Sequence, residues 1–168
     1  MIGRVINNKF TSANAPRQSI MISNRPIKLL LVEDDLGDSD LIEEAFEDST
    51  YPIKLTLVRD GIQAIAYLRR EDKYANAPLP DLILLDLNLP RMGGHEVLKT
   101  IKSDANFKHI PVIVLTTSDS QEEILTAYKS GANCYLCKPL GLQEFIELVR
   151  TIENYWFTVV KLPIAEYP

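Results

Sequence analysis

The stretch that decides the fold is DLILLDLNLP, residues 81–90. Four apolar residues, 82–85, stand in a row between polar and turn-forming residues, which predicts a strand buried on both faces of a parallel sheet. Asp86 follows at the carboxyl end of that strand, where open α/β sheets place their ligands. The stretch therefore predicts a parallel sheet with a functional carboxylate at its edge.

Strand and helix patterns alternate along the rest of the chain. The other strand patterns cover residues 27–32, 53–57, 111–115 and 133–137. Each is followed by apolar residues at helical spacing, and right-handed crossovers then dictate a parallel sheet with helices on both faces. Residues 53–57 alternate apolar and polar side chains, as an edge strand does. We therefore expect a flavodoxin-like (βα)5 fold, a doubly wound parallel α/β sheet with strand order 2-1-3-4-5.

Length and composition are those of one globular domain, with 168 residues of which 46% are hydrophobic. The net charge of −5 argues against a nucleic-acid partner, because nucleic-acid-binding domains are usually basic. No apolar run approaches the roughly 20 residues of a membrane helix. Asn7, Asn8 and Lys9 interrupt any signal-peptide core. We expect a cytoplasmic protein without a membrane or nucleic-acid partner.

Three segments are expected. Residues 1–25, rich in Asn, Ser, Thr and Arg, form a mobile N-terminal extension; residues 26–157 form the folded domain; residues 158–168 form an apolar C-terminal tail. Only 29 residues follow Pro139, so we expect no DNA-binding output domain. The aromatic run from residue 155 onward either folds back over its own domain or joins the last helix in a dimer interface, where aromatic anchors are common.

Cys134 and Cys137 have the C-x-x-C spacing of redox and metal sites. On a strand, residues three apart point to opposite faces and lie about 10 Å apart at roughly 3.3 Å per residue. A disulfide needs Cα atoms within about 7 Å, and no second ligand cluster completes a zinc site. We therefore expect two buried structural cysteines.

Carboxylate, hydroxyl and ammonium side chains stand at the ends of four predicted strands. They are Glu33 and Asp34, then Asp86, then Thr116 and Thr117, and finally Lys138. Carboxylates gathered at one sheet edge repel one another unless a cation joins them, and an open site with oxygen ligands suits Mg²⁺. Asp86 can then attack phosphorus to form an aspartyl phosphate. Lys138 and the Thr116 hydroxyl would offset charge on the phosphoryl oxygens.

Each of these residues also has a structural explanation when it is taken alone. The acidic run that begins at Glu33 could cap a helix, Asp86 could cap a turn, Thr116 could bond to its own backbone, and Lys138 could be solvated. Their coincidence at one sheet edge favours phosphoryl transfer.

The sequence resembles the receiver domain of two-component response regulators. The resemblance rests on LLLVEDD at 29–35, on residues 81–90 with Gly93-Gly94, on PVIVLT at 111–116, and on the stretch from Gly131-Ala132 to Lys138-Pro139. It covers about residues 26–157. It implies that Asp86 is the phospho-acceptor. It also implies that Asp34, Asp86 and the backbone carbonyl of Asn88 bind Mg²⁺, with Glu33 reaching the metal through water.

The same resemblance assigns the residues around the phosphoryl group. Thr116 and Lys138 would contact it, and the bond between Lys138 and Pro139 would be cis. Tyr135 matches the family's aromatic switch, whose rotamer is coupled to Thr116, although a half-buried strand aromatic is the alternative. Thr117 stands where many members have a smaller residue, which would alter how tightly the switch closes.

A narrower resemblance points to single-domain regulators that serve cyanobacterial phytochrome kinases. It rests on residues 33–38, on Tyr67-Leu68-Arg69, and on residues 86–91. It implies a sensor histidine kinase, of the phytochrome type, as phosphoryl donor. Phosphorylation would switch conformation and partner binding, including a homodimer through the last helix and the aromatic tail. The implied protein is a phospho-accepting switch with at most slow self-dephosphorylation, and not an enzyme.

The same residues bear on three other functions. A relay intermediate would pass its phosphate to a second histidine protein. A haloacid-dehalogenase-like phosphatase needs a second Asp two residues after the nucleophile, where this chain has Asn88. A flavodoxin-like flavin protein would place its cofactor phosphate against the carboxylates of Asp34 and Asp86, which would repel it without a metal.

Overall fold

A five-stranded parallel sheet forms the centre of the computed structural model, which describes residues 25–163. The strand order is 2-1-3-4-5, so the predicted flavodoxin-like fold is confirmed. The strands are β1 (Ile27–Val32), β2 (Ile53–Val58), β3 (Leu82–Leu85), β4 (Val112–Thr116) and β5 (Cys134–Cys137). All neighbouring pairs run parallel, so their carboxyl ends meet at one edge.

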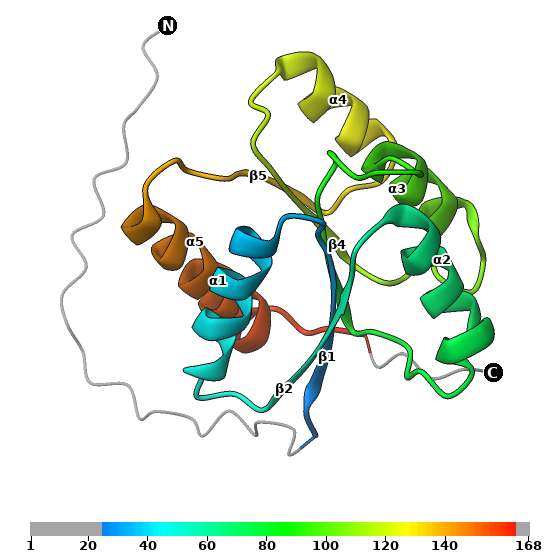
Figure 1. The fold of residues 1–168 in the computed structure, drawn as a ribbon, viewed down its shortest axis with the longest axis horizontal. Coiled ribbons are helices and arrows are strands. Elements are labelled where there is room, and N and C mark those ends of the chain that lie inside the picture. The colour runs from blue at the N-terminus through cyan, green and yellow to red at the C-terminus, as the bar shows by residue number, and fades with distance from the viewer. Residues whose placement is uncertain (1–24, 164–168) are drawn as a thin grey trace, which may run out of the picture.

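Helices cover both faces of the sheet (Figure 1). Two of them, α1 (Leu36–Glu47) and α5 (Leu142–Asn154), lie together on one face. The other face carries α2 (Gly61–Arg69), α3 (Gly94–Ser103) and α4 (Gln121–Lys129). A 3₁₀ turn (Asp72–Tyr74) follows α2, and a π-helical turn (Tyr155–Val159) extends α5. No described helix is long and apolar enough to cross a membrane.

The core lies on both sides of the central strands. Every side chain from Leu82 to Leu85 is fully buried, as the apolar run predicts. Leu82 and Leu84 point to the α1–α5 face, whereas Ile83 and Leu85 point to the opposite face. The strand is therefore buried on both faces, and it carries the chain directly to Asp86.

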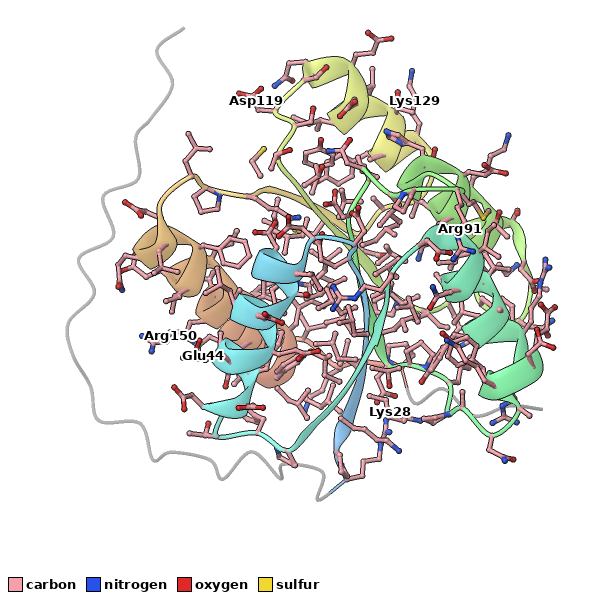
Figure 2. The ribbon with its side chains drawn as sticks, in the orientation of Figure 1. Lys28, Glu44, Arg91, Asp119, Lys129 and Arg150 are labelled. Carbon is pink, nitrogen blue, oxygen red and sulfur yellow. The ribbon has the colours of Figure 1, made fainter. Side chains whose placement is uncertain are left out.

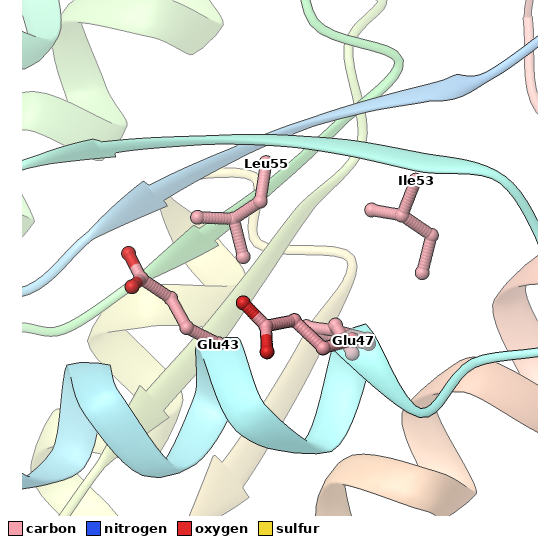
Figure 3. Close-up of a pocket in the computed structure, with 5 residues that line it drawn as sticks. Glu43, Glu47, Ile53 and Leu55 are labelled. Carbon is pink, nitrogen blue, oxygen red and sulfur yellow. The ribbon is translucent and has the colours of Figure 1, made fainter.

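The edge strand β2 is only half-buried, as its alternating sequence predicts. A groove of about 300 Å³ separates it from α1. In the close-up of Figure 3, the side chains of Glu43 and Glu47 extend from α1 toward Ile53 and Leu55 of the strand. The acidic side chains of α1 therefore stand over an apolar floor at this edge of the sheet.

The aromatic segment after α5 folds back on the domain. The Phe157 ring lies 6.0 Å from the Phe46 ring and 6.4 Å from the Tyr51 ring, measured between centroids. Tyr155 and Val159 remain exposed. The aromatic run thus folds back over its own domain at Phe157, while two of its apolar side chains stay available to a partner. The predicted N-terminal extension lies outside the described residues except for Arg25, and so do residues 164–168 of the tail.

The two cysteines are free thiols, but they are not both buried. Cys134 is half-buried and Cys137 is exposed, with its Sγ 3.3 Å from the carbonyl oxygen of Ser118. The expectation of two buried cysteines is therefore wrong. The physical reason is that β5 is an edge strand, which leaves part of each of its residues uncovered.

Gly94 opens α3 directly behind Asp86 and leaves no space for a side chain. A Cβ there would lie 2.5 Å from the Cα of Leu87 and closer still to the carbonyl oxygen of Asp86. We predict that Gly94→Ala lowers the free energy of unfolding by at least about 2 kcal/mol, the scale of overpacking. Urea unfolding followed by circular dichroism measures it. Gly93→Ala is the matched control, because a Cβ at Gly93 meets nothing within 4 Å; equal losses in both variants would contradict the prediction.

Candidate functional site

Three carboxylates converge at the carboxyl edge of the sheet. Glu33 and Asp34 follow β1 and Asp86 follows β3, and one oxygen of each lies within 4.8 Å of the others. Glu33 and Asp86 are 1% and 6% exposed, whereas Asp34 is open to solvent. The sheet therefore brings together the carboxylates that the sequence places at two strand ends.

Lys138 joins this cluster from the end of β5. Its Nζ donates hydrogen bonds to Glu33 Oε2 at 2.7 Å and to Asp86 Oδ2 at 2.8 Å. Burial alone would lower the pKa of the Lys138 ammonium, but its hydrogen bonds to Asp38, Asp86 and Glu33 outweigh burial and raise that pKa. Lys138 therefore stays charged and neutralises part of the cluster.

Asp38 is a member of the site that sequence reasoning did not assign. Its Oδ2 accepts the third Lys138 hydrogen bond, at 2.8 Å. Asp35 caps α1 by accepting a hydrogen bond from the Asp38 backbone N–H at 2.8 Å, which fixes the first turn of the helix. The signal in the sequence was the acidic run that continues into the first turn of α1, but the direction of the Asp38 side chain depends on this cap.

The Glu33 carboxyl is almost fully buried, where a charge loses most of its hydration. Burial raises the pKa of its carboxyl, while the hydrogen bond and charge of Lys138 lower it. The backbone N–H of Asp35 donates to Glu33 Oε1 at 3.0 Å. A buried carboxylate beside two others favours the arrival of a further cation, and hard divalent ions prefer such oxygen donors. The donor set of Glu33, Asp34 and Asp86 thus fits a divalent metal.

Asn88 links the acidic cluster to β4. Its backbone N–H donates to Asp86 Oδ1 at 3.0 Å, and its Nδ2 donates to Thr116 Oγ1 at 3.3 Å. Thr116 is fully buried, whereas Thr117 is exposed. The Thr116 hydroxyl accepts from Asn88, so its proton can still be donated to another oxygen.

Tyr135 lies near the site but is bonded elsewhere. Its hydroxyl donates to the carbonyl oxygen of Ser118 at 2.9 Å, in the loop between β4 and α4. Burial raises the pKa of the Tyr135 phenol, and the hydrogen bond to Ser118 partly opposes this. The side chain is half-buried, so both explanations offered for Tyr135 fit its position.

The peptide bond between Lys138 and Pro139 is trans, so the expected cis bond is wrong. The trans form is the more stable state of an X–Pro bond by about 0.5–1 kcal/mol. The backbone N–H of Lys138 nevertheless donates to the Thr116 carbonyl at 2.7 Å, which keeps β5 paired to β4 up to the site.

The geometry matches a known family. Residues 29–150 match the family model described as the response regulator receiver domain. The chain belongs to this family. Receiver domains are signalling switches that are phosphorylated on an Asp and bind a divalent metal at an acidic pocket.

Relatives share the sequence over most of their length. The response regulator Rcp1 of Synechocystis sp. is 45% identical over 143 residues, which cover 85% of this chain and 97% of that protein. The probable methanogenesis regulatory protein FilR2 of Methanothrix harundinacea is 39% identical over 137 residues, which cover 82% of this chain and 88% of that protein. The predicted resemblance to receiver domains is thereby confirmed.

Two solved structures agree with the fold. The phosphorylated cyanobacterial phytochrome response regulator RcpA superposes with a TM-score of 0.81 at 48% identity, covering 83% of this chain and 99% of that one. The Mn²⁺-bound form of Rcp1 has a TM-score of 0.80 at 44% identity, covering 82% and 99%. The narrower resemblance to phytochrome response regulators is therefore confirmed as well.

Removing the Lys138 ammonium would leave Glu33 and Asp86 buried without their cation. We predict that Lys138→Ala lowers the free energy of unfolding by about 3 kcal/mol, the usual cost of breaking a buried ion pair from one side. Urea titration in metal-free buffer measures the loss. Lys54→Ala, on the exposed side of β2, is the control and should change the free energy of unfolding by less than about 0.5 kcal/mol. A Lys138→Ala protein as stable as the control would contradict the assignment of Lys138 as the balancing charge.

Proposed function

We propose that this receiver domain is a cytoplasmic switch in which Asp86 accepts a phosphoryl group from the phosphohistidine of a sensor histidine kinase. The observation that carries the proposal is the joining of three strand ends by one ammonium: Lys138 bonds both Asp86 and Glu33, and Asp34 stands open beside them. A carboxylate oxygen of Asp86 attacks phosphorus, a P–O bond forms, the P–N bond breaks, and the electron pair leaves with the kinase histidine.

The residues around Asp86 would contribute to this phosphoryl transfer in different ways. Asp34, Asp86 and the backbone carbonyl of Asn88 would hold Mg²⁺, with Glu33 acting through water; bound there, the ion offsets negative charge on the transferring group. Lys138 already contacts Asp86 and supplies a second positive charge. The buried Thr116 hydroxyl donates its free proton to a phosphoryl oxygen.

The donor we propose is a phytochrome-type kinase. Support comes from the relatives, since RcpA is a cyanobacterial phytochrome response regulator. A further solved relative is the response regulator RPA3017 in red light signaling of R. palustris, at 34% identity and a TM-score of 0.75, covering 82% of this chain and 98% of that one. The role is that of a switch and not of a phosphatase, because Asn88 has no carboxyl group to serve as general acid or base.

Asn at position 86 keeps the size of the side chain but removes the nucleophilic carboxylate. We predict that Asp86→Asn abolishes labelling by a ³²P-phosphorylated phytochrome-type histidine kinase, because an amide oxygen is a poor nucleophile toward phosphorus. The measurement is gel autoradiography of the transfer reaction over time. Asp35→Asn is the matched control, since Asn caps a helix as well as Asp and the residue is exposed. Persistent labelling of Asp86→Asn would remove Asp86 from this role.

We also propose that phosphorylation promotes a homodimer through α5 and the aromatic segment. Exposed Tyr155 and Val159 give this face apolar contacts, and Leu142 at the start of α5 is exposed as well. Thr116 and Tyr135 would couple phosphorylation to the conformation of the β4–α4 loop, because the Tyr135 hydroxyl donates a hydrogen bond to the Ser118 carbonyl in that loop.

Beryllofluoride with Mg²⁺, a mimic of the phosphoryl group, should shift wild-type protein toward dimer elution in gel filtration. We predict that Tyr135→Ala still takes up phosphate but reduces this shift, because the variant loses the ring that we propose to couple Thr116 to the β4–α4 loop. Tyr135→Phe keeps the ring and loses only the hydrogen bond to Ser118, so it separates the two contributions. A Tyr135→Ala protein that dimerises like wild type would count against Tyr135 as the switch.

A further inference from the structure

Arg91 has a backbone conformation that needs an explanation. Its φ is 64°, in the left-handed region that residues with a Cβ rarely adopt. Arg91 lies in the β3–α3 loop (residues 86–93), and Figure 2 places it beside α2. Its guanidinium donates to Oδ2 of Asp60, the residue that caps the amino end of α2. The ion pair therefore holds the loop in a conformation that its own residues do not favour.

The Asp60 carboxylate is buried and depends on its ion pair with Arg91. It is only 2% exposed, and Arg91 is the cation that pairs with it among the described residues. The same carboxylate caps α2 by accepting hydrogen bonds from Gln63 N at 2.9 Å and from Gln63 Nε2 at 2.7 Å. A buried carboxylate that loses its cation is left with an uncompensated charge. Asp60 thus anchors Arg91 to a rigid helix end.

A second contact presses the loop against the same helix. A Cβ on Gly61 would overlap the carbonyl oxygen of Met92, so the backbones of α2 and the loop meet directly. At the base of the loop, the Gly94 N–H donates to the Leu87 carbonyl at 3.0 Å. The loop is therefore fixed to α2 on one side and closed on itself at its base.

The loop carries Asn88 between these fixed points. The Asn88 backbone N–H bonds to Asp86 Oδ1, and its side chain bonds to Thr116. We propose that the Asp60–Arg91 ion pair positions this loop so that the Asn88 carbonyl faces the acidic cluster, and thereby sets the affinity of the cluster for a divalent cation. This inference rests on the proposed function, which places the cation at Asp34 and Asp86.

Arg91→Gly separates positioning from simple backbone stability. Glycine adopts a φ of 64° without strain, so the variant keeps the loop conformation accessible but loses the ion pair. We predict that Mn²⁺ binds this variant about tenfold more weakly than wild type. Losses of this size are typical when a residue that orients a metal ligand is mutated. The measurement is the free Mn²⁺ signal in electron paramagnetic resonance during a titration. Asp60→Asn, which keeps the helix cap, should weaken binding to a similar extent, and the double variant should lose no more than either single one.

Two controls make the result decisive. Asp72→Gly also changes a residue of positive φ, at 49°, but in the 3₁₀ turn beyond the carboxyl end of α2, and should bind Mn²⁺ like wild type. Arg91→Lys keeps a cation and should recover much of the affinity. Unchanged binding by Arg91→Gly, or additive losses in the double variant, would overturn the positioning role. If wild type binds no Mn²⁺, or if Asp34→Asn binds it equally well, the proposed metal site itself is wrong and the inference falls with it.

Discussion

The site depends on one buried ammonium that joins three strands. Lys138 follows β5, and its hydrogen-bond partners Glu33 and Asp86 follow β1 and β3. To reach them, the side chain passes the end of β4, where its own backbone N–H bonds to Thr116. Two carboxylates this deeply buried would repel each other and lose much of their hydration. The Lys138 ammonium offsets both the repulsion and the lost hydration, so the folded sheet tolerates several charges at its carboxyl edge.

Local rules account for the parts of the structure that the sequence predicted. Four apolar residues in a row predict a doubly buried strand from 82 to 85, and the alternation at β2 predicts a sheet edge; both follow from burial alone. The convergence of Glu33, Asp86 and Lys138 follows in turn from a parallel sheet, because strand ends share an edge whatever their separation in the chain. This convergence does not depend on any particular side-chain conformation.

The features that were missed depend on geometry or on neighbours. Asp38 reaches Lys138 because the cap at Asp35 sets the start of α1, which no spacing rule contains. The ion pair between Asp60 and Arg91 joins residues 31 positions apart through two side-chain conformations. Cys137 is a different case. The predicted strand order already places β5 at an edge, and this edge position exposes Cys137 although cysteine side chains are usually buried.

The site is fixed on some sides and adjustable on another. Gly94 presses against the backbone at Asp86, Lys138 is fully bonded, and Arg91 ties the β3–α3 loop to α2, so these sides resist movement. The β4 side is held more weakly, by one long hydrogen bond of 3.3 Å from Asn88 to Thr116 and by a half-buried Tyr135 bonded to a loop carbonyl. Rotation of Thr116 or Tyr135 breaks few contacts and exposes no buried charge. A new group on Asp86 would therefore alter the β4–α4 loop before it altered α2 or α1, which favours α4 and β5 as the surface where a phosphate-dependent change appears.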